Sequence, residues 1–266
     1  MKLLTLNCHS WLEENQWDKM KWIAEAIVQN DYDVIALQEV NQLIDSPIVK
    51  GKMKTDNFAY VLLQELKLQG VSTYQCHWDV SHIAYDKYEE GLAILTKHPI
   101  KEVTSFYVTK NQSIDYWKSR KIVGVKVEIN GQSITFYSCH FGWWNDEEEP
   151  FQYQINQLMK CINQEDWYFL MGDFNNDANK RGEGYDYVIE RNLLDTYHLA
   201  VQKDEGFTVT GKIAGWDDNK EDLRIDYILT NRKVKVATSN IIFNGKNKPI
   251  VSDHYGVEVG IPLQGK

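Results

Sequence analysis

This 266-residue sequence has few of the residues that cross-link or segment a chain. Its four cysteines (Cys8, Cys76, Cys139 and Cys161) are far apart and form no Cys-x-x-Cys pair. This spacing argues against a disulfide framework or a zinc knuckle, and it suits a reducing compartment. The sequence also lacks a linker, a low-complexity stretch and an internal repeat. We therefore expect a single domain over residues 1–266.

Long apolar runs are absent as well. No stretch reaches the length of a transmembrane helix, and the first seven residues are too poor in apolar side chains for a secretory signal. We expect a cytoplasmic protein, or a mature chain whose signal has been removed. We expect no membrane span, and the sequence shows no obligate protein partner.

Basic residues are scarce relative to acidic ones. Lysine and arginine number 29 against 38 aspartates and glutamates, which gives a net charge of −9, and there is no arginine-rich loop. Strong nucleic-acid binding usually depends on basic side chains at phosphates, so this balance weighs against it. It does not exclude a nuclease, because a bound divalent cation reverses the sign of the charge locally.

The hydrophobic pattern predicts many strands and few helices. Helical spacing indicates helices at 17–30, 56–69 and 147–163, with a short one inside 176–191. Strands are predicted at 2–7, 33–37, 72–80, 90–96, 101–109, 121–130, 132–140, 166–172, 223–230, 233–243 and 255–261. Residues 41–55 and 198–222 are predicted to be irregular. This excess of strands over helices favours a layered α/β sandwich over a repeating βαβ fold.

Two local patterns fix parts of the topology. The order strand, helix, strand over residues 2–37 predicts a parallel pair joined by a right-handed crossover. The dipeptide Asn130-Gly131, between two strand patterns, predicts a tight β-hairpin and therefore an antiparallel middle of the chain.

The segment 167–175 carries the clearest chemical signal. The apolar run Trp167–Met171 predicts a buried strand, and Gly172 allows a tight turn or the close approach of another backbone. If Asp173 and Asn175 are extended, their side chains point the same way, so that a carboxylate lies beside an amide. The alternative is a simple Asx turn at a strand end.

Other polar residues also lie at predicted strand ends. Buried carboxylates are costly unless they are paired or bind a metal, so several of them at strand ends indicate a shared polar cleft. Predicted strand ends carry Asn7, Glu39, His140, Asp173 and Asn175. Asp226 is the central carboxylate of the strand predicted at 223–230, and Asp253 and His254 come just before the strand predicted at 255–261.

Seven short motifs in order resemble the endonuclease/exonuclease/phosphatase superfamily, which includes DNase I-like nucleases. They are Thr5-Leu6-Asn7, Leu37-Gln38-Glu39, the stretch 90–95, Ser138-Cys139-His140-Phe141, Gly172-Asp173-Phe174-Asn175, Arg224-Ile225-Asp226-Tyr227 and Ser252-Asp253-His254. The resemblance implies a four-layer α/β sandwich in which two packed mixed sheets are flanked by helices. It spans nearly the whole chain.

The resemblance also implies a metal site and a water-activating site. Glu39 would be the principal Mg²⁺ ligand, with Asn7 nearby, and Mn²⁺ could replace Mg²⁺ because both prefer oxygen ligands. Asp173 would orient or deprotonate the attacking water, and Asn175 would donate to a phosphoryl oxygen. Taken alone, Glu39 could equally be a solvated residue at a helix start.

Two histidines receive roles from the resemblance. His254 would bind phosphate or assist proton transfer, held by Asp226, while Asp253 would be an orienting carboxylate or a second metal contact. His140 would be the general acid. A histidine at this position resembles the DNase I, sphingomyelinase and deadenylase branches, whereas the AP-endonuclease branch lacks it. A lone histidine is otherwise most often a satisfied core residue.

Three further features remain open. Glu90 would orient His140, again by resemblance. Arg120 would hold a substrate phosphate, or would belong to a solvated charge cluster. The run 146–149 is best explained as the acidic first turn of the helix predicted at 147–163.

Four tryptophans near the predicted site loops could stack on a base or sugar or could only pack at the rim: Trp11, Trp143, Trp144 and Trp216. Cys8 and Cys139 adjoin site residues but should face away from the site by strand alternation.

The resemblance, with these residues in place, implies a Mg²⁺-dependent hydrolase of phosphoric esters, in particular a phosphodiesterase that uses in-line attack by water. Its partner would be a phosphoester substrate, either a small molecule or a nucleic acid. One alternative is a DNase-like endo- or exonuclease. Another, of a different class, is a catalytically silent phosphate-binding protein on the same scaffold.

Overall fold

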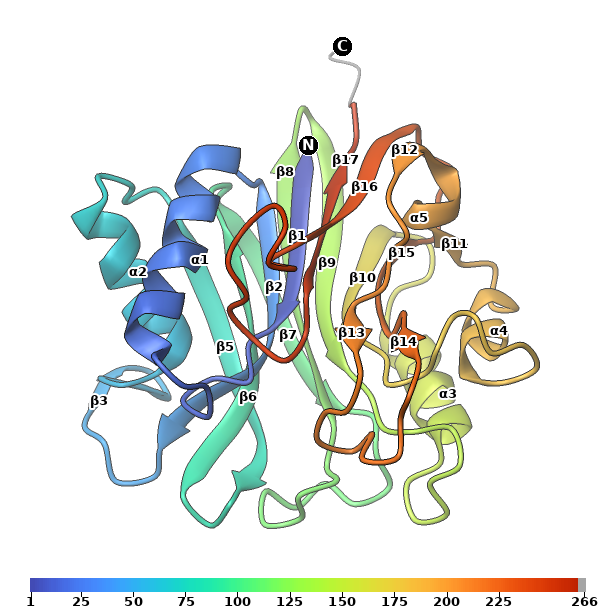
Figure 1. Ribbon diagram of the computed structural model, residues 1–266, viewed down its shortest axis with the longest axis horizontal. Coiled ribbons are helices and arrows are strands. Elements are labelled where there is room, and N and C mark those ends of the chain that lie inside the picture. Colours follow the sequence, from blue (N-terminus) through green and yellow to red (C-terminus); the bar gives the residue numbers. More distant parts are fainter. Residues whose placement is uncertain (263–266) are drawn as a thin grey trace.

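Two β-sheets form the centre of the protein, as Figure 1 shows. The computed structural model describes residues 1–262. The seven-stranded sheet has the order β12 (Ala200–Lys203), β16 (Val236–Ile242), β17 (Gly256–Gly260), β1 (Lys2–Asn7), β2 (Val34–Leu43), β6 (Tyr88–Thr96) and β5 (Gln75–Ala84). The six-stranded sheet has the order β11 (Leu194–Asp195), β15 (Asp226–Thr230), β10 (Trp167–Asp173), β9 (Gln132–His140), β8 (Lys121–Ile129) and β7 (Ile100–Tyr107).

Helices cover the outer faces of both sheets. Helices α1 (Gln16–Asn30) and α2 (Phe58–Leu68) pack on the seven-stranded sheet, whereas α3 (Phe151–Cys161) and α4 (Gly184–Ile189) pack on the other sheet (Figure 1). The inner faces of the two sheets share a separate core that includes Leu3, Phe136 and Phe169. Adjacent residues alternate between these layers: Leu3 belongs to the inner core and Leu4 to the outer one. The predicted four-layer sandwich is confirmed.

The parallel strand pair and the tight hairpin that the two local patterns predict are both present. Strands β1 and β2 are parallel and are joined by α1. Strands β8 and β9 are antiparallel, and the turn between them has φ of 51° at Asn130 and 72° at Gly131. Positive φ at both central residues is the requirement of the type I′ hairpin turn.

Some predicted boundaries were wrong because side chains and bulges override simple periodicity. Strand β2 runs past Glu39 to Leu43 through an irregularity between Leu37 and Val40, so it does not end at residue 37. The region 41–55 therefore contains the end of β2 and a small hairpin, β3 (Ile48–Lys50) and β4 (Met53–Lys54). The region 198–222 includes the end of α5 (Thr196–Leu199), β12, β13 (Val209–Thr210) and the first residue of β14 (Asp222–Leu223).

The acidic run 146–149 does not form the first turn of a helix. Helix α3 begins at Phe151, after Pro150. Asp146 Oδ1 instead accepts hydrogen bonds from the backbone N–H groups of Glu148 and Glu149, which closes a turn before the helix. The buried carboxylate of Glu149 accepts from the backbone N–H groups of Lys110 and Asn111. The run therefore ties down the loop that precedes β8.

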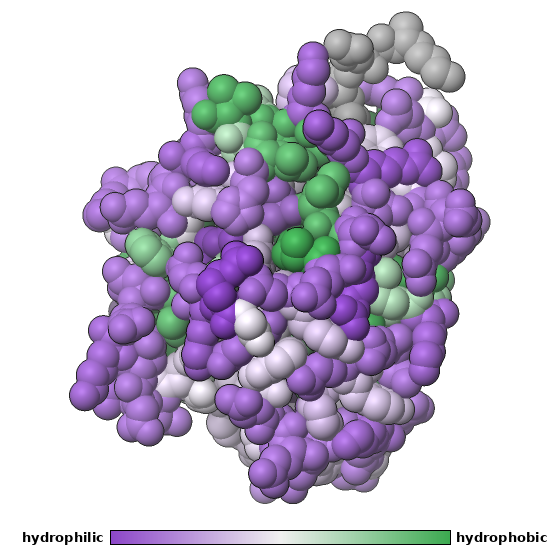
Figure 2. All heavy atoms as spheres, turned by 90° about the vertical axis from the view of Figure 1, so that its right-hand side faces the viewer, coloured by the Kyte–Doolittle hydropathy of each residue, from purple (hydrophilic) through white to green (hydrophobic). Residues whose placement is uncertain are grey.

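The surface is largely polar on the side that Figure 2 shows, which is the right-hand side of Figure 1. Hydrophilic side chains cover most of it, and hydrophobic ones form a band from the upper left to the centre and smaller patches towards both sides. Over residues 1–262, no helix is long and apolar enough to cross a membrane.

Gly172 lies where the backbone of β9 closely approaches β10. Its φ is 150°, and a Cβ atom there would lie 1.9 Å from the backbone oxygen of Cys139 on β9. The predicted close approach of another backbone is thus confirmed. No side chain can be accommodated unless β9 and β10 separate.

We expect Gly172→Ala to lower the free energy of unfolding by about 3 kcal/mol or more, because it adds a backbone clash to an unfavourable φ. Gly131→Ala is the matched control: its φ is 72°, and nothing lies within 4 Å of the added Cβ. It should cost only about 1 kcal/mol. Urea denaturation of both variants measures the difference, and equal losses would contradict the proposed clash.

Candidate active site

The predicted polar residues meet at one edge of the sandwich, where strands of both sheets end. Strands β1 and β2 run parallel in one sheet, and β9 and β10 run parallel in the other. Asn7, His140 and Asp173 are the last residues of β1, β9 and β10. The loops that follow gather at the lower edge of Figure 1. Together they surround a cleft of about 500 Å³.

Asn7 connects the two sheets at the base of this cleft. Its side-chain N–H₂ donates to Glu39 Oε1 at 2.9 Å and to Asp173 Oδ2 at 3.1 Å. Its side-chain oxygen accepts from the backbone N–H of His9 at 3.2 Å. In this orientation Asn7 positions the two carboxylates and does not offer its oxygen to the cleft.

Glu39 reaches the cleft because β2 is distorted there. Its φ is 50°, in the left-handed region, and the register with β6 shifts between Leu37 and Val40. Non-glycine residues rarely adopt this φ, and strain of this kind is concentrated at functional sites. The side chain is half-buried. Burial, together with the nearby charge of Glu39, raises the pKa of Glu90 to about 8.

Asp173 and Asn175 form the Asx turn that was the alternative prediction. The backbone N–H of Asn175 donates to Asp173 Oδ1 at 2.8 Å, and the φ of Asn175 is 49°, so the extended conformation was wrong. Both side chains nevertheless line the cleft. The Asn175 side-chain N–H₂ donates to the oxygen of Phe141 at 2.9 Å, and Trp216 Nε1 donates to Asn175 Oδ1 at 3.1 Å.

His254 forms a buried pair with Asp226. His254 Nδ1 lies 2.9 Å from Asp226 Oδ2, and Nε2 lies 3.8 Å from Asp173 Oδ2. Burial opposes the charged imidazolium, but Asp226 and Asp173 outweigh it and raise the pKa of His254 to about 10. Burial also raises the pKa of Asp173 to about 7, although the charge of His254 opposes that shift.

The position of Asp226 follows from strand register. Asp226 is the first residue of β15, not a central one, and it lies opposite Asp173 of β10. The pairing of His254 with Asp226 is present as the resemblance implied.

His140 approaches Asp173 from the other side. Its Nε2 lies 3.7 Å from Asp173 Oδ2. Burial and the charge of Arg120 hold the pKa of His140 well below its usual range. His140 is therefore neutral in this state, with two imidazoles flanking a single carboxylate oxygen.

The structure does not bring Glu90 to His140. Glu90 lies directly opposite His82 in the antiparallel pairing of β5 and β6, and its Oε1 is 3.5 Å from His82 Nε2. No hydrogen bond or ion pair joins Glu90 to His140, because no ring nitrogen of His140 lies within 4.0 Å of a carboxylate oxygen of Glu90. The predicted contact is wrong because the register gives Glu90 another imidazole, which the sequence analysis did not single out.

Arg120 is buried in the wall of the cleft and does not belong to a solvated charge cluster. It is only 5% exposed, and its Nε is buried without a hydrogen-bond partner. Its guanidinium donates to the backbone oxygen of Trp117 at 3.4 Å, a long contact. A desolvated guanidinium with unused donors is suited to binding an anion.

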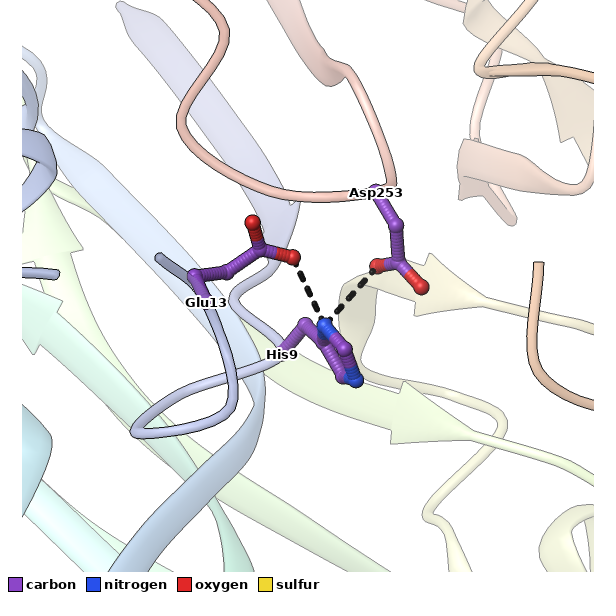
Figure 3. Close-up of side chains that lie close together, drawn as sticks. All are labelled: His9, Glu13 and Asp253. Atoms are coloured by element: carbon purple, nitrogen blue, oxygen red, sulfur yellow. Dashed lines mark hydrogen bonds and ion pairs between the residues drawn. The ribbon is translucent and has the colours of Figure 1, made fainter. Parts of the chain in front are cut away.

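A second cluster at the cleft contains His9, Glu13 and Asp253, as Figure 3 shows. His9 Nδ1 lies 2.7 Å from Glu13 Oε1 and 3.8 Å from Asp253 Oδ1. Burial opposes ionisation of His9, but these two carboxylates and Glu39 raise its pKa. Asp253 therefore faces His9, and the sequence analysis placed neither His9 nor Glu13 in the site. The signal was available, because His9 follows Asn7 by two residues.

The four tryptophans divide between packing and the site. Trp11 packs on Phe58, and Trp144 packs on Phe151. Trp143 lines the cleft, and Trp216 holds the amide of Asn175. Trp117 also lines the cleft and was missed, because it lies in a polar loop with no motif.

The predictions for the cysteines are confirmed. Cys8 and Cys139 are buried in the two outer cores, away from the cleft.

The donor set of the cleft fits a hard divalent cation. The carboxylates of Glu39, Glu90, Asp173 and Asp253 line it, and oxygen ligands are those that Mg²⁺ and Mn²⁺ prefer. The raised pKa of Glu90 reflects in part repulsion from Glu39, which a cation between them would relieve. A larger hollow, of about 710 Å³, lies at the opposite end of β9 and β10 and contains none of these groups.

Comparisons with known proteins agree with this fold. The family model described as "Endonuclease/Exonuclease/phosphatase family" matches residues 16–254. A comparison with curated proteins returned no match. Among solved structures, an endonuclease/exonuclease/phosphatase family protein from Leptotrichia buccalis is 44% identical, with a TM-score of 0.93, over 99% of this chain and 100% of that one.

More distant structures share the fold. A mannosyl-6-phosphatase from Bacteroides thetaiotaomicron is 16% identical with a TM-score of 0.72. A 3′ phosphatase from Neisseria, bound to a product DNA hairpin, is 18% identical with a TM-score of 0.65. Each comparison covers 99% of this chain and 100% of the other. By its family match and its 44% identical relative, the chain belongs to the endonuclease/exonuclease/phosphatase family of phosphoester-hydrolysing enzymes.

Proposed function

We propose that this protein is a Mg²⁺-dependent hydrolase of phosphoric esters that uses in-line attack by water, with phosphodiesters as its preferred substrates. One observation carries the proposal. Asp173 Oδ2 is held by Asn7 and has an imidazole nitrogen on either side, 3.7 Å away in His140 and 3.8 Å away in His254. A carboxylate between two proton-carrying groups can orient a water molecule and move its proton.

The two imidazoles differ in charge, which suggests different roles. His254 is kept protonated by Asp226, so that its Nε2–H would donate to a phosphoryl oxygen as charge develops there. His140 is neutral because it is buried beside Arg120. An anionic phosphate bound to Arg120 would offset that charge and favour a protonated His140, which could then protonate the leaving oxygen.

The remaining residues would hold the metal and position the substrate. Glu39 would be the principal ligand, with Asp253 as a second carboxylate and Asn7 positioning Glu39. A bound Mg²⁺ would neutralise negative charge on the phosphoryl group. Asn175 would donate to a phosphoryl oxygen, and Glu90 would act on His82 or on the metal, since it does not contact His140.

The two alternatives are less well supported. A nuclease needs basic side chains for successive phosphates, and Arg120 is the only lysine or arginine among the described residues that line the cleft. A silent binding protein would not need the Asp173 carboxylate between two imidazoles, which an anionic ligand would encounter as a repulsive charge.

We expect His140→Ala and His254→Ala each to lower kcat by about 10²–10⁴-fold, because each removes a proton-transfer or charge-stabilising group. Hydrolysis of bis-p-nitrophenyl phosphate and p-nitrophenyl phosphate, with Mg²⁺ or with EDTA, measures this. His198→Ala is the control, since His198 is exposed and lies outside the cleft. EDTA should abolish turnover by the wild type. Near-wild-type turnover in both site variants would refute the assigned roles.

We expect Asp226→Asn to lower the pKa of His254 below about 10, because the carboxylate that contributes most to the rise is lost and the burial remains. A histidine NMR titration of metal-free protein measures this. The folded pKa of His254 lies above 6.5, so the pair stabilises the wild type fully below that pH. This contribution is lost as the pH rises towards 10. In the variant, the free energy of unfolding should not show this decrease with rising pH. An unchanged pKa of His254 would contradict the pairing.

A further inference from the structure

The charges around the cleft limit how many phosphates a substrate can bring. Five carboxylates line it, from Glu39, Glu90, Asp173, Asp217 and Asp253. Against them, Arg120 is the only lysine or arginine among the described lining residues. A divalent cation would neutralise some of this charge, but a second phosphate would meet uncompensated carboxylates. The cleft therefore suits a ligand with one phosphoryl group.

Aromatic side chains form the outer walls of the same cleft. Trp117 and Trp143 have ring centroids 6.4 Å apart and an interplanar angle of 56°, so they make an open corner. Trp117 is 52% exposed and Tyr85 is 66% exposed, and both line the cleft. Large exposed aromatic rings beside a polar site are typical of surfaces that bind a ring by its face.

The indole corner is held in place by contacts that serve no catalytic purpose. The loop of Trp117 is fastened by Lys118, whose Nζ lies 2.9 Å from Asp146 Oδ2 and 2.7 Å from Glu148 Oε2. On the other side, Gly215 packs directly on Trp143, where a Cβ would lie 2.3 Å from Cζ2 of the indole. A wall that is fixed before binding loses little entropy when a ligand stacks on it.

The corner also lies next to the groups proposed to bind phosphate. The guanidinium of Arg120 donates to the backbone oxygen of Trp117 at 3.4 Å. A ring attached to a phosphate at Arg120 would therefore reach the indoles. A cleft of about 500 Å³ can hold a ligand of this size.

We propose that Trp117 and Trp143 form a subsite for the organic group of the substrate, and that the substrate is a small phosphoester with one phosphoryl group and one neutral ring. The ring would be a sugar or a nucleobase, since either presents an apolar face to an indole. This inference rests on the proposed function, and it excludes polynucleotides as the preferred substrates.

The test compares kcat/KM for the methyl phosphodiesters of glycerol, glucopyranose and thymidine, and for dodecathymidylate. In the wild type, kcat/KM for at least one of the two ring esters should be about tenfold higher than for the glycerol ester. The ester with the higher value identifies the ring that the subsite binds. Trp117→Ala should reduce the ratio of ring ester to glycerol ester about tenfold, through KM. Gly215→Ala should reduce it too, because the added methyl displaces the Trp143 indole.

Trp17→Ala is the matched control, because Trp17 is 63% exposed and lies outside the cleft. It should leave the ratio unchanged. A merely structural role of Trp117 would lower kcat/KM for all esters alike and keep the ratio, which would overturn the proposal. Dodecathymidylate as the best substrate would also overturn it.

Failure of the proposed function is separable from failure of this inference. If no ester is hydrolysed, the catalytic proposal fails, and quenching of tryptophan fluorescence by the same esters still tests the subsite. The subsite would be supported if a ring ester quenches the fluorescence more strongly than the glycerol ester does and if this difference is lost in Trp117→Phe. Equal quenching by all esters would refute it.

Discussion

The amide of Asn7 is the contact on which the arrangement of the site depends. It donates at once to a carboxylate from the seven-stranded sheet, Glu39, and to one from the six-stranded sheet, Asp173. The inner core that joins the two sheets is otherwise largely apolar. Near the same edge, Gln38 of β2 donates to Ser138 of β9 at 2.9 Å, so a second polar contact joins the sheets there. Two carboxylates can lie near each other in a largely buried site because a neutral hydrogen-bond donor lies between them.

Unusual backbone conformations surround that contact. Glu39 and Asn175 have φ near 50°, and Gly172 lets β9 and β10 approach more closely than a side chain would allow. Each feature moves a functional side chain to a position that regular strands would not give it. The regular interior of both sheets provides the packing that offsets this local strain.

Much of the fold was predictable from sequence because its signals are local. The apolar run before Asp173, the Asn130-Gly131 turn and the strand–helix–strand opening each depend on neighbours in the chain. The site residues were found because they end strands: Asn7, His140 and Asp173 are the last residues of theirs. Alternation also placed Cys139 correctly in the core.

The predictions that failed concern residues whose contacts are distant in sequence. The partner of Glu90 is fixed by the register of two strands, and no local pattern shows that it is His82. Asp146 and Glu149 bond to backbone groups of a turn and of another loop, so a helix-start rule misassigned them. Trp117 lies at the cleft on a loop that Lys118 ties to that acidic run, a contact between segments distant in sequence.

Cation binding is the most direct test of the central claim, which is that the carboxylates of this cleft hold a divalent metal with Glu39 as the principal ligand. Mn²⁺ binding, followed by electron paramagnetic resonance at pH 7, should be at least about tenfold weaker in Glu39→Gln than in the wild type, since a principal charged ligand is lost. Glu190→Gln is the control, because Glu190 is exposed and lies outside the cleft. Unchanged Mn²⁺ affinity in Glu39→Gln would contradict the account.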